Sequence, residues 1–553
     1  LDSYGILATG RTAESPSVRA VNDEMEGLRV GSVMLPAIFL GIAALIINIV
    51  LRRQIANERT LIGTLRALGC SKGLIVRHYL AAGAWLGIIG SAAGILCGFA
   101  LQAQYCALYE QFYSFPSIQP AIYSDIIVIA AIIGMAFTAG GAALPALDAA
   151  KLNPAVAMRP PPPEIGKRIF IDRFESIWKR LPFRWKMIFR HIVRNPFRSG
   201  VSIGATFIST AIIFMTINMF DALDYLMAHE FKKMMAQDLT LTMHFGIDER
   251  GVSEIQGLPS VAMVETQFVA ACDFINGPRR RRLGVIGLPR DARLQCPIDS
   301  QGRRIVIPDA GLVLSRKLAE VLDIAPGDAV RLKAMTGERR EVVAPVTAVV
   351  DTYLGVSAYA EKDWLARLFG ETGTVNAALV STGGGDQTEL LREISRRPMI
   401  SGVLERSRAY QIMQETFGQL MGLMILTTIV IAGLIAFGTV YNMTRVSVSE
   451  REREIGTLRV LGFSTKDVSA IFTGESILLN AVGVGLGMFG GIGFSALIIR
   501  LYNQEMYRFP LVITPSQFIY TALALVAIVF FAQRLVIRMI RSFRWLDALK
   551  IKE

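Results

Sequence analysis

Seven apolar segments constrain this chain most, because each is long enough to cross a lipid bilayer, which takes about 20 residues. They lie near residues 33–51, 80–102, 126–147, 202–220, 420–441, 470–498 and 518–537. Hydrophobic residues make up 52% of the 553 residues, and the mean hydropathy is +0.43. These values suit a chain that lies partly in a membrane and partly in water. The sequence therefore predicts a polytopic α-helical membrane protein.

A stretch of 11 residues occurs twice and divides the chain into two related halves. Residues 62–72 and 455–465 lie 393 positions apart (455 minus 62) and are identical at 8 of their 11 positions. Each copy follows one apolar segment and precedes another. A repeat of this kind is typical of membrane proteins built from duplicated helical bundles.

The repeated stretch has the pattern of a short amphipathic helix. Apolar residues recur at every third position of each copy: Ile62, Leu65 and Leu68 in the first, and Ile455, Leu458 and Leu461 in the second. Gly69 and Gly462 follow these residues, and glycine commonly ends a helix. Ser464 and Asp467 form a capping box that predicts the start of the next helix. Each half is thus expected to contain a short helix joined by a tight turn to the following span.

The distribution of basic residues predicts the orientation of the chain. The segment 52–78 carries six Lys and Arg residues and 151–198 carries twelve, whereas 103–125 carries none. Because short loops rich in Lys and Arg remain in the cytoplasm, we expect 52–78, 151–198, 443–469 and the C-terminal tail on that side. The N-terminus and 221–417 then lie outside, since large domains cross the membrane regardless of their charge.

The two halves differ in the number of their spans. The second half has one span, an external domain and three further spans, whereas the first half shows only the last three. We therefore expect a first span and most of a first external domain to precede Leu1, which makes eight spans in the full chain. The first half is expected to contain the end of a truncated first periplasmic domain (1–32) and a membrane half of three spans (33–158) with its amphipathic helix near 58–70. A cytoplasmic linker with an amphipathic interfacial helix (159–198) joins it to the second half. The second half is expected to contain its first span (199–220), a mixed α/β periplasmic domain (221–417) and a membrane half of three spans (418–553) with its amphipathic helix near 450–463.

Smaller patterns predict further local structure. Glycines at every fourth position of one span in each half predict close helix packing: Gly90, Gly94 and Gly98 in the first, and Gly483, Gly487 and Gly491 in the second. Apolar and cationic residues interleave over 183–198, which predicts an amphipathic helix on the inner leaflet. The external domain is expected to contain a helix over 316–322 and strands over 329–333, 341–350 and 377–380.

Four consecutive arginines, 279–282, are interpreted as a solvated hairpin tip, with contact to an anionic lipid or a partner as the alternative. A disulfide between Cys272 and Cys296 is conceivable on the outer side, although spacing alone does not support it. The four histidines are scattered, so no metal site is expected. The basic residues flank the apolar segments, which indicates membrane topology and argues against a nucleic-acid partner.

The second copy resembles the FtsX-like permeases, the membrane subunits of ABC transporters of the macrolide-exporter and lipoprotein-releasing type. The resemblance rests on Glu-Arg-Glu-Arg-Glu-Ile-Gly-Thr-Leu-Arg-Val-Leu-Gly at 450–462, with Glu475 in the next span. Arg-Asn-Pro-Phe-Arg at 194–198 resembles the family's entry to its first span. Leu-Asn-Pro-Ala-Val-Ala-Met-Arg at 152–159 resembles its tail after the fourth span.

The resemblance implies that the two repeated helices are coupling helices seated in a separate cytoplasmic ATPase dimer, which would bind ATP and Mg²⁺. It also implies that ATP-driven closure of that dimer is passed mechanically to the external domain. By position, the residues that would contact the ATPase are Arg59, Arg66, Leu68, Gly69 and Lys72 in the first half, and Arg453, Glu454, Arg459, Leu461, Gly462 and Lys466 in the second.

The first copy departs from the family pattern. Glu454 aligns with Leu61, and Glu475 aligns with Ala82, so the first half lacks both carboxylates. We therefore expect the ATPase to engage the second half more tightly. The chain has no Gly-x-x-x-x-Gly-Lys-Ser/Thr motif, so ATP hydrolysis is expected to come from the partner subunit and not from this chain.

Two functions are compatible with these features. The first is a permease in the bacterial inner membrane that extracts or exports a lipid, a lipoprotein or a hydrophobic compound. A candidate apolar path for that substrate consists of Ile212, Phe214, Met215, Met219, Phe220, Met421, Met424 and Ile425. Ordinary lipid-facing surface explains these residues equally well. The second function is a transmembrane force or signal transmitter that moves no substrate and activates a periplasmic partner, such as an adaptor or a cell-wall hydrolase.

Overall fold

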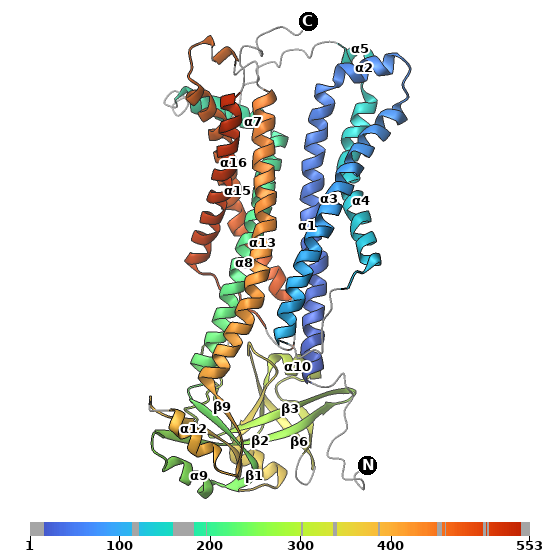
Figure 1. Ribbon diagram of the computed structural model, residues 1–553. Helices are drawn as coiled ribbons and strands as arrows, with labels where there is room; N and C mark the ends of the chain where they lie inside the picture. Colours follow the sequence, from blue (N-terminus) through green and yellow to red (C-terminus); the bar gives the residue numbers. More distant parts are fainter. Residues whose placement is uncertain are drawn as a thin grey trace. The chain divides into compact units, whose positions relative to one another are not determined.

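The computed structural model in Figure 1 divides into two compact units, each described here by itself. The structure describes residues 16–112, 121–158, 182–194, 196–299, 302–335, 340–384, 387–450, 456–458, 460–501, 505 and 508–542. The membrane unit contains Gly31–Asn218, Gln419–Ser495 and Ile513–Glu553. The α/β unit contains Met219–Gly418 and Ala496–Val512, together with Leu1–Val30.

Within the described residues, seven helices are long and apolar enough to cross a membrane. They are α1 (Pro16–Asn57), α3 (Lys72–Phe112), α4 (Ser124–Lys151), α8 (Pro196–Ala228), α13 (Arg406–Glu450), α15 (Thr465–Leu501) and α16 (Pro515–Ser542). This confirms the seven predicted spans. Most of the helices continue beyond the apolar segments, because a helix satisfies its own backbone hydrogen bonds and can extend into water with polar residues. The chain is therefore a polytopic α-helical membrane protein.

Three short helices accompany the spans: α2 (Arg59–Ala67), α5 (Pro154–Ala157) and α7 (Phe183–Arg194). The first and third confirm the amphipathic helices predicted from the repeat and from 183–198. However, α7 ends at Arg194, and α8 begins at Pro196, where proline suits the first turn of a helix. A turn of π-helix, η4 (His229–Met234), follows α8 directly.

In the first membrane half, α4 packs closely against both α1 and α3. A Cβ atom added at Gly141 would lie 2.4 Å from the carbonyl oxygen of Ala44 on α1, so this crossing requires glycine. Next to it, Asn48 donates a hydrogen bond to the carbonyl oxygen of Gly141 at 3.1 Å. Arg52 and Asp148 form an ion pair at 3.0 Å one turn further along.

In the second membrane half, α15 packs closely against α8. A Cβ at Gly487 would lie 2.5 Å from Cβ of Thr210, which shows how close the two backbones are. The hydroxyl of Thr206 donates to Oδ1 of Asn480 at 2.7 Å, in a fully buried position. The predicted packing role of the glycine stripe is therefore seen in this half, where Gly483, Gly487 and Gly491 all face α8.

The α/β unit is built on nine strands, β1 (Leu239–Asp248), β2 (Met263–Asn276), β3 (Arg279–Leu288), β4 (Leu312–Ser315), β5 (Ala329–Ala334), β6 (Glu341–Val350), β7 (Ala358–Glu361), β8 (Thr374–Ser381) and β9 (Ile400–Glu405). The strand order is β3-β7-β4-β6-β5-β2-β8-β1-β9, and β2 also pairs with β3. The first six strands thus close into a ring, and β8, β1 and β9 extend it as a sheet from the other end of β2. The long strand β2 belongs to both parts, because 263–267 pair with β8 and 268–276 pair with β3.

Four short helices cover the strands: α9 (Glu249–Gln256), α10 (Arg316–Leu322), α11 (Lys362–Phe369) and α12 (Gln387–Ser395). Figure 1 shows α9 and α12 beside β1 and β9. The ring encloses one apolar core, in which Phe274, Leu318 and Leu332 are fully buried, and α9 and α12 cover a second core around Leu241 and Ile255. The predicted helix 316–322 and the predicted strands at 329, 341 and 377 are all present.

The side chains of Cys272 and Cys296 are both buried, and both are free thiols, so the conceivable disulfide is not formed. The Cys272 thiol faces the core of the ring and donates to the carbonyl oxygen of Ala270 at 3.4 Å. Burial, with a smaller contribution from the charge of Asp273, raises the pKa of the Cys272 thiol to about 12. The thiol is therefore protonated and unreactive at neutral pH.

The arginine run lies at a hairpin tip, as predicted, because β3 begins directly after the turn at 277–278, where Asn276 pairs with Arg279. Its side chains are not only solvated, however, since they are also paired within the α/β unit. Arg280 and Arg282 both bind the carboxylate of Asp273, whose side chain is only 2% exposed. Arg279 pairs with Asp323 at 3.0 Å, and Arg281 pairs with Glu505 at 2.9 Å. The hydrophobic pattern could not reveal these pairs, because their acidic partners lie up to 224 positions away in the chain.

Replacement of Asp273 by asparagine is expected to destabilise the ring in a pH-dependent way. Burial raises the pKa of this carboxyl, but Arg282 and Arg280 outweigh that effect and hold the pKa below its usual range. A lowered pKa stabilises the fold above the unfolded value of about 4, and that stabilisation is lost as pH falls through the lowered pKa. We expect a cost of roughly 1–3 kcal/mol at pH 7, since both arginines remain partly in contact with water.

Hydrogen exchange of β2 and β3 peptides in the intact protein measures this effect. Faster exchange of Asp273→Asn than of the wild type is expected at pH 7, with a smaller difference near pH 3. An equal difference at both pH values would show that the carboxylate charge does not contribute.

Candidate functional site

The first copy of the repeated stretch forms α2 and a tight turn that leads into α3. Gly69 has φ +96°, a left-handed conformation in which glycine is strongly preferred. The amide of Cys70 donates to the carbonyl oxygen of Leu65 at 3.0 Å, and that of Gly69 donates to Arg66 at 3.2 Å. These bonds close the end of the helix as in a Schellman motif. The turn, Leu68 to Ser71, thus joins α2 to a 41-residue helix without a flexible linker.

Two of the predicted ATPase contacts, Arg59 and Arg66, are instead bound to the membrane unit itself. Arg59 donates to the carbonyl oxygen of Val156 at 3.1 Å. Arg66 donates to the carbonyl oxygens of Ala150 and Leu152, the latter at 3.2 Å, where α4 ends. Carbonyl groups at the end of a helix lack partners and attract cations. Both arginines therefore hold α2 against α4 and α5, which the family resemblance did not predict.

Further contacts fix the other face of α2. Ile62 is 3% exposed and packs in a cluster with Leu51, Ile75 and Ala146. The hydroxyl of Tyr79 on α3 donates to the carboxylate of Glu58, next to the start of α2, at 2.6 Å. A displacement of α2 must therefore move the first turns of α3 and the end of α4 with it.

Replacement of Arg66 by methionine is expected to loosen α2. The change leaves the carbonyl groups at the end of α4 without their charged donor, at a cost on the order of 1 kcal/mol. Hydrogen exchange of a peptide over 59–70 should then speed up by roughly fivefold. The exposed Lys72, replaced in the same way, is the matched control and should leave exchange unchanged. Unchanged protection in the Arg66 variant would mean that the apolar contacts alone hold α2.

The turn itself presents apolar residues to the outside. Leu68 is 83% exposed at the tip, and Leu61 is 57% exposed on the outer face of α2. Gly69 and Lys72 are exposed beside them. Leu65 is 39% exposed as well, and several exposed apolar residues close together can mark a contact with a partner.

The second copy has the same turn in its described residues. Gly462 has φ +91°, and the amide of Phe463 donates to the carbonyl oxygen of Leu458 at 3.0 Å. The predicted capping box is present, because the amide of Ser464 donates to Asp467 at 3.1 Å and the amide of Asp467 donates back at 3.2 Å. Leu461 is 69% exposed at the tip. The exposed Lys466 lies in the first turn of α15, whereas Arg453, Glu454 and Arg459 lie outside the described residues.

In the described part of the chain, α7 covers the second copy, whereas the first copy contacts the short helix α5. In the second half, α7 packs its fully buried Ile188 against Leu458, Val468 and Phe472. The rings of Phe183 and Phe463 lie 5.9 Å apart. Leu458 is 8% exposed as a result, whereas Leu65, at the same position of the first copy, is 39% exposed.

One buried polar pair joins α7 to α15. Nδ1 of His191 lies 3.7 Å from Oε2 of Glu475, and both side chains are at most 10% exposed. The sequence analysis singled out Glu475 but not His191. The signal was available, because His191 lies three positions after Ile188 and so falls on the apolar face of α7.

The predicted substrate path is only partly accessible. Ile212, Phe214 and Met215 are 1%, 0% and 8% exposed, so they are buried packing residues in this conformation. Met219, Met421, Met424 and Ile425 are half-buried, and Phe220 is 38% exposed. The first three residues were predicted from an apolar pattern, which cannot separate a helix packed against its neighbours from one that faces a ligand.

In the α/β unit, an ion pair ties the start of α13 to the sheet. Arg406, the first residue of α13, donates to Asp238 at 3.2 Å and to the carbonyl oxygen of Phe231 in η4 at 3.2 Å. Asp238 also accepts hydrogen bonds from the amide and hydroxyl of Thr382, at 2.8 and 2.9 Å. Burial raises the pKa of Asp238, but these hydrogen bonds outweigh it and lower the pKa below its usual value. The charged pair thus joins η4, β1, α13 and the end of β8.

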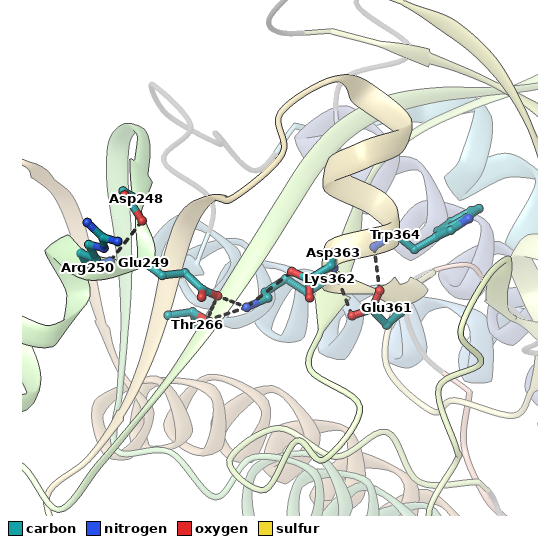
Figure 2. Close-up of polar contacts among 8 residues, drawn as sticks. All are labelled: Asp248, Glu249, Arg250, Thr266, Glu361, Lys362, Asp363 and Trp364. Atoms are coloured by element: carbon teal, nitrogen blue, oxygen red, sulfur yellow. Dashed lines mark hydrogen bonds and ion pairs between the residues drawn. The ribbon is translucent and has the colours of Figure 1, made fainter.

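A second polar cluster joins two of the covering helices (Figure 2). Lys362, at the start of α11, contacts Glu249 at the start of α9 and Thr266 of β2, the hydroxyl at 3.1 Å. Each helix also has an acidic N-cap. Asp248 accepts from the amide of Arg250 at 3.3 Å, and Glu361 accepts from the amide of Trp364 at 2.6 Å. These contacts hold α9 and α11 on the sheet as one rigid body.

This geometry defines a multi-pass membrane protein with two repeated halves, each of which contains a turn that ends on a left-handed glycine. Two segments, 33–154 and 426–544, match the family model described as FtsX-like permease C-terminal. They coincide with the two membrane halves and contain both turns. Both membrane halves therefore match the FtsX-like permeases, as the repeated stretch predicts.

Curated relatives match shorter parts of the chain. Macrolide export ATP-binding/permease protein MacB of Bdellovibrio bacteriovorus is 37% identical over 79 residues, which cover 14% of this chain and 12% of that protein. MacB of Chlorobium phaeobacteroides is 28% identical over 184 residues, 32% of this chain and 26% of that protein. An uncharacterized ABC transporter permease of Methanocaldococcus jannaschii is 24% identical over 191 residues, 34% of this chain and 47% of that protein. The chain thus spans less than half the length of each of these relatives.

Two solved structures resemble a third of the chain. The periplasmic region of MacB from Actinobacillus actinomycetemcomitans is 10% identical with a TM-score of 0.22, and covers 32% of this chain and 94% of that one. The extracellular domain of the noncanonic ABC-type transporter YknZ from Gram-positive bacteria is 16% identical with a TM-score of 0.21, and covers 33% of this chain and 95% of that one. At these TM-scores the likeness supports no further argument about this chain.

Proposed function

We propose that this chain is the membrane subunit of an ABC transporter, and that its two exposed turns bind a separate cytoplasmic ATPase dimer, which holds ATP and Mg²⁺. The observation that carries the proposal is the exposure of Leu461. Helix α7 covers the neighbouring Leu458, which is only 8% exposed. In contrast, Leu461 at the tip is 69% exposed. The tip is therefore left free where the rest of the repeated stretch is packed, as a contact with another subunit requires.

The proposed mechanism is the mechanical transmission of ATPase movement to the α/β unit. Each turn is continuous with a long helix, since α3 follows the first and α15 follows the second. Immediately before the second copy, α13 runs 45 residues without a break, roughly 67 Å at 1.5 Å per residue. It begins at Arg406, which is locked to Asp238 of the α/β unit. A displacement of the cytoplasmic end of α13 is thus expected to be passed along this helix towards the α/β unit.

The proposed orientation follows from the basic residues. The loops 52–78 and 151–198 are rich in Lys and Arg, which supports a bacterial inner-membrane protein with both turns and the C-terminus in the cytoplasm and the α/β unit outside. The second turn is expected to engage the ATPase more tightly, because Leu61 and Ala82 replace the two glutamates in the first half.

A lipid, a lipoprotein or a hydrophobic compound is the proposed substrate class. The supporting observation is a groove of about 1070 Å³ between α15 and α16 in the membrane unit. Apolar residues such as Ile477, Val484 and Phe530 line it, and Arg534 and Arg538 lie towards one end. An apolar groove with cations at one end suits a molecule with an acyl chain and an anionic headgroup. The two bacterial relatives are named as macrolide export proteins, which suggests a hydrophobic drug as a further candidate.

The second candidate function is a transmitter that activates an external partner and moves no substrate. The end of the sheet favours it, because among the described strands β9 pairs on one side only, with β1. Leu404 on β9 and Phe245 on β1 are 56% and 81% exposed. An open strand edge with exposed apolar residues can bind a partner by strand addition.

Purification in a gentle detergent, with mass spectrometry of all bound proteins and lipids, tests the proposal. A stoichiometric ATPase together with a retained lipid or acylated protein is the expected result. An ATPase with an external protein and no amphiphile would favour the transmitter over the exporter. Recovery of the chain without any ATPase would contradict the proposed role of both turns.

A further inference from the structure

The groove between α15 and α16 lies where the first membrane half packs the equivalent helices together. In the first half, a Cβ at Gly87 of α3 would lie 2.9 Å from Cα of Met135 on α4, so the two backbones nearly touch. The offset of 393 places Asn480 of α15 at the position of Gly87. Asn480 has a side chain too large for such a contact, and it lines the groove of about 1070 Å³. The second half thus leaves a space of the size that binds a whole ligand.

The groove lies at the depth of one leaflet of the membrane. It follows α15 from Thr473 to Gly485 and α16 from Leu525 to Arg538. Twelve residues of α15 (485 minus 473) rise by roughly 18 Å, close to the ~15 Å of hydrocarbon in one leaflet. Because the C-terminal tail is expected in the cytoplasm, the end of the groove at Arg538 lies at the cytoplasmic surface. The groove is therefore expected to open to lipids of the cytoplasmic leaflet.

Two arginines mark the cytoplasmic end of the groove. Arg534 and Arg538 are four positions apart on α16, so they lie on the same face of the helix, and both are exposed. The guanidinium group of Arg534 lies 5.7 Å from the centroid of the Phe530 ring. In the described part of the chain, neither arginine pairs with a carboxylate. Guanidinium groups bind phosphate with paired hydrogen bonds, so this end of the groove suits a phosphate.

A buried amide lies next to these arginines. Gln533 lines the groove and is 6% exposed. Among the described residues, neither its amide nitrogen nor its amide oxygen has a hydrogen-bond partner. Such a group is costly to bury, and within a membrane no water replaces the missing partner. Gln533 precedes Arg534 by one residue, so it lies slightly deeper in the membrane. An ester carbonyl just below a phosphate could accept from its amide nitrogen.

We propose that the groove binds a glycerophospholipid of the cytoplasmic leaflet that has an anionic headgroup. Its phosphate binds Arg534 and Arg538, an ester carbonyl accepts a hydrogen bond from the amide of Gln533, and an acyl chain follows the apolar wall past Val484 and Val526. An uncharged amphiphile would leave both arginines without an anionic partner. The inference names the ligand of the groove in the proposed function, and it rests on that function for the orientation in the membrane.

Photo-cross-linking with a lipid probe tests the proposal. The complete chain, purified without an ATPase, is placed in phosphatidylcholine vesicles with a trace of phosphatidylglycerol that carries a photoreactive group at the end of one acyl chain. Adducts are expected in peptides that contain Val484 or Val526. Unlabelled phosphatidylglycerol should compete at least about tenfold better than phosphatidylcholine, because only the former has a net negative headgroup. Equal competition by both lipids, or adducts spread evenly over all spans, would overturn the proposal.

Variants of the two arginines test the charge argument. Arg534→Gln together with Arg538→Gln is expected to lower the adduct yield at least roughly tenfold, because two charged donors to the phosphate are lost. Arg77→Gln together with Arg184→Gln is the matched control, since it removes the same charge from two exposed arginines outside the groove. The control should keep the yield of the wild type. Equal yields from the two double variants would overturn the proposal.

The change Gln533→Leu separates a ligand-binding amide from a merely structural one. It is expected to lower the adduct yield by roughly fivefold through the loss of one hydrogen bond. In detergent without phospholipid, the same variant should melt at a higher temperature than the wild type, because leucine replaces an unbonded buried amide. A lower melting temperature, or an undiminished adduct yield, would show that Gln533 does not bind the lipid.

These outcomes are distinct from a failure of the proposed function. Absence of adducts in the groove, with an ATPase still recovered in co-purification, would overturn only the lipid site. Adducts in the groove of a chain that recovers no ATPase would support the lipid site and contradict only the proposed role of the turns.

Discussion

Aspartate in place of Leu68 and Leu461 together is expected to reduce recovery of the ATPase subunit in a co-purification by at least roughly tenfold. The two side chains are 83% and 69% exposed at the tips of the rigid turns. Burial of a leucine contributes about 1.5–3 kcal/mol, and a carboxylate at the same place adds a cost of desolvation. The fold of the chain should be unaffected, because neither leucine packs inside the membrane unit.

The matched control places aspartate at Val306 and Leu404, which are 84% and 56% exposed on the α/β unit. These changes alter the same residue type and exposure away from the turns, so ATPase recovery should equal that of the wild type. Undiminished recovery from the Leu68 and Leu461 variant would place the ATPase contact elsewhere.

A valine at Gly487 is expected to lower the melting temperature of the purified chain by roughly 3–10 °C. An added Cβ there would lie 2.5 Å from Cβ of Thr210 and 2.7 Å from the carbonyl oxygen of Phe207. The two helices must then move apart, which breaks the contacts of a closely packed interface. Thermal unfolding in detergent measures the change.

The repeat provides the control for this prediction. Gly94 occupies the same position on α3 and has nothing within 4 Å, so Gly94→Val should leave the melting temperature of the chain purified alone nearly unchanged. Equal losses from the two variants would mean that valine acts through helix propensity and not through the contact with α8.

The membrane architecture was largely predictable from the sequence. Apolar length defined the seven spans, and the exact spacing of the repeat defined both turns, because Gly69 and Gly462 adopt the left-handed conformation that ends such helices. The capping box of Ser464 and Asp467 was likewise visible as a local pattern. Features that depend on neighbours in sequence, such as periods and caps, are the ones that a single sequence reveals.

The partners of individual side chains were not predictable, because they come from distant parts of the chain. Arg66 has the same sequence context as an exposed contact residue, yet it binds the end of α4, 84 positions away. The arginines of β3 are partly exposed, as expected, but Arg280 and Arg282 also bind the buried Asp273. The identical glycine stripes behave differently, since only the second one is covered by α8. Whether a helix packs on a glycine stripe depends on the tertiary structure, so the glycine spacing alone could not predict this difference.

Neighbouring residues of the repeated stretch therefore have different roles. The arginine and isoleucine of the first copy attach α2 to the membrane unit, whereas the leucine at the tip remains available to a partner. The second copy repeats the exposed tip and adds α7 on its other face. In the proposed function, the base of the turn is fixed to a long helix and passes on force, while the tip contacts the ATPase.

Site-specific photo-cross-linking at the two tips tests the central claim most directly. A photoreactive amino acid at position 68 or 461, with position 306 of the α/β unit as the control, captures whatever lies beside the turn in living cells. The account predicts adducts with one cytoplasmic ATPase subunit at both tips, more abundant at 461, and none at 306. Adducts with lipid alone, or the absence of any ATPase adduct at both tips, would contradict it.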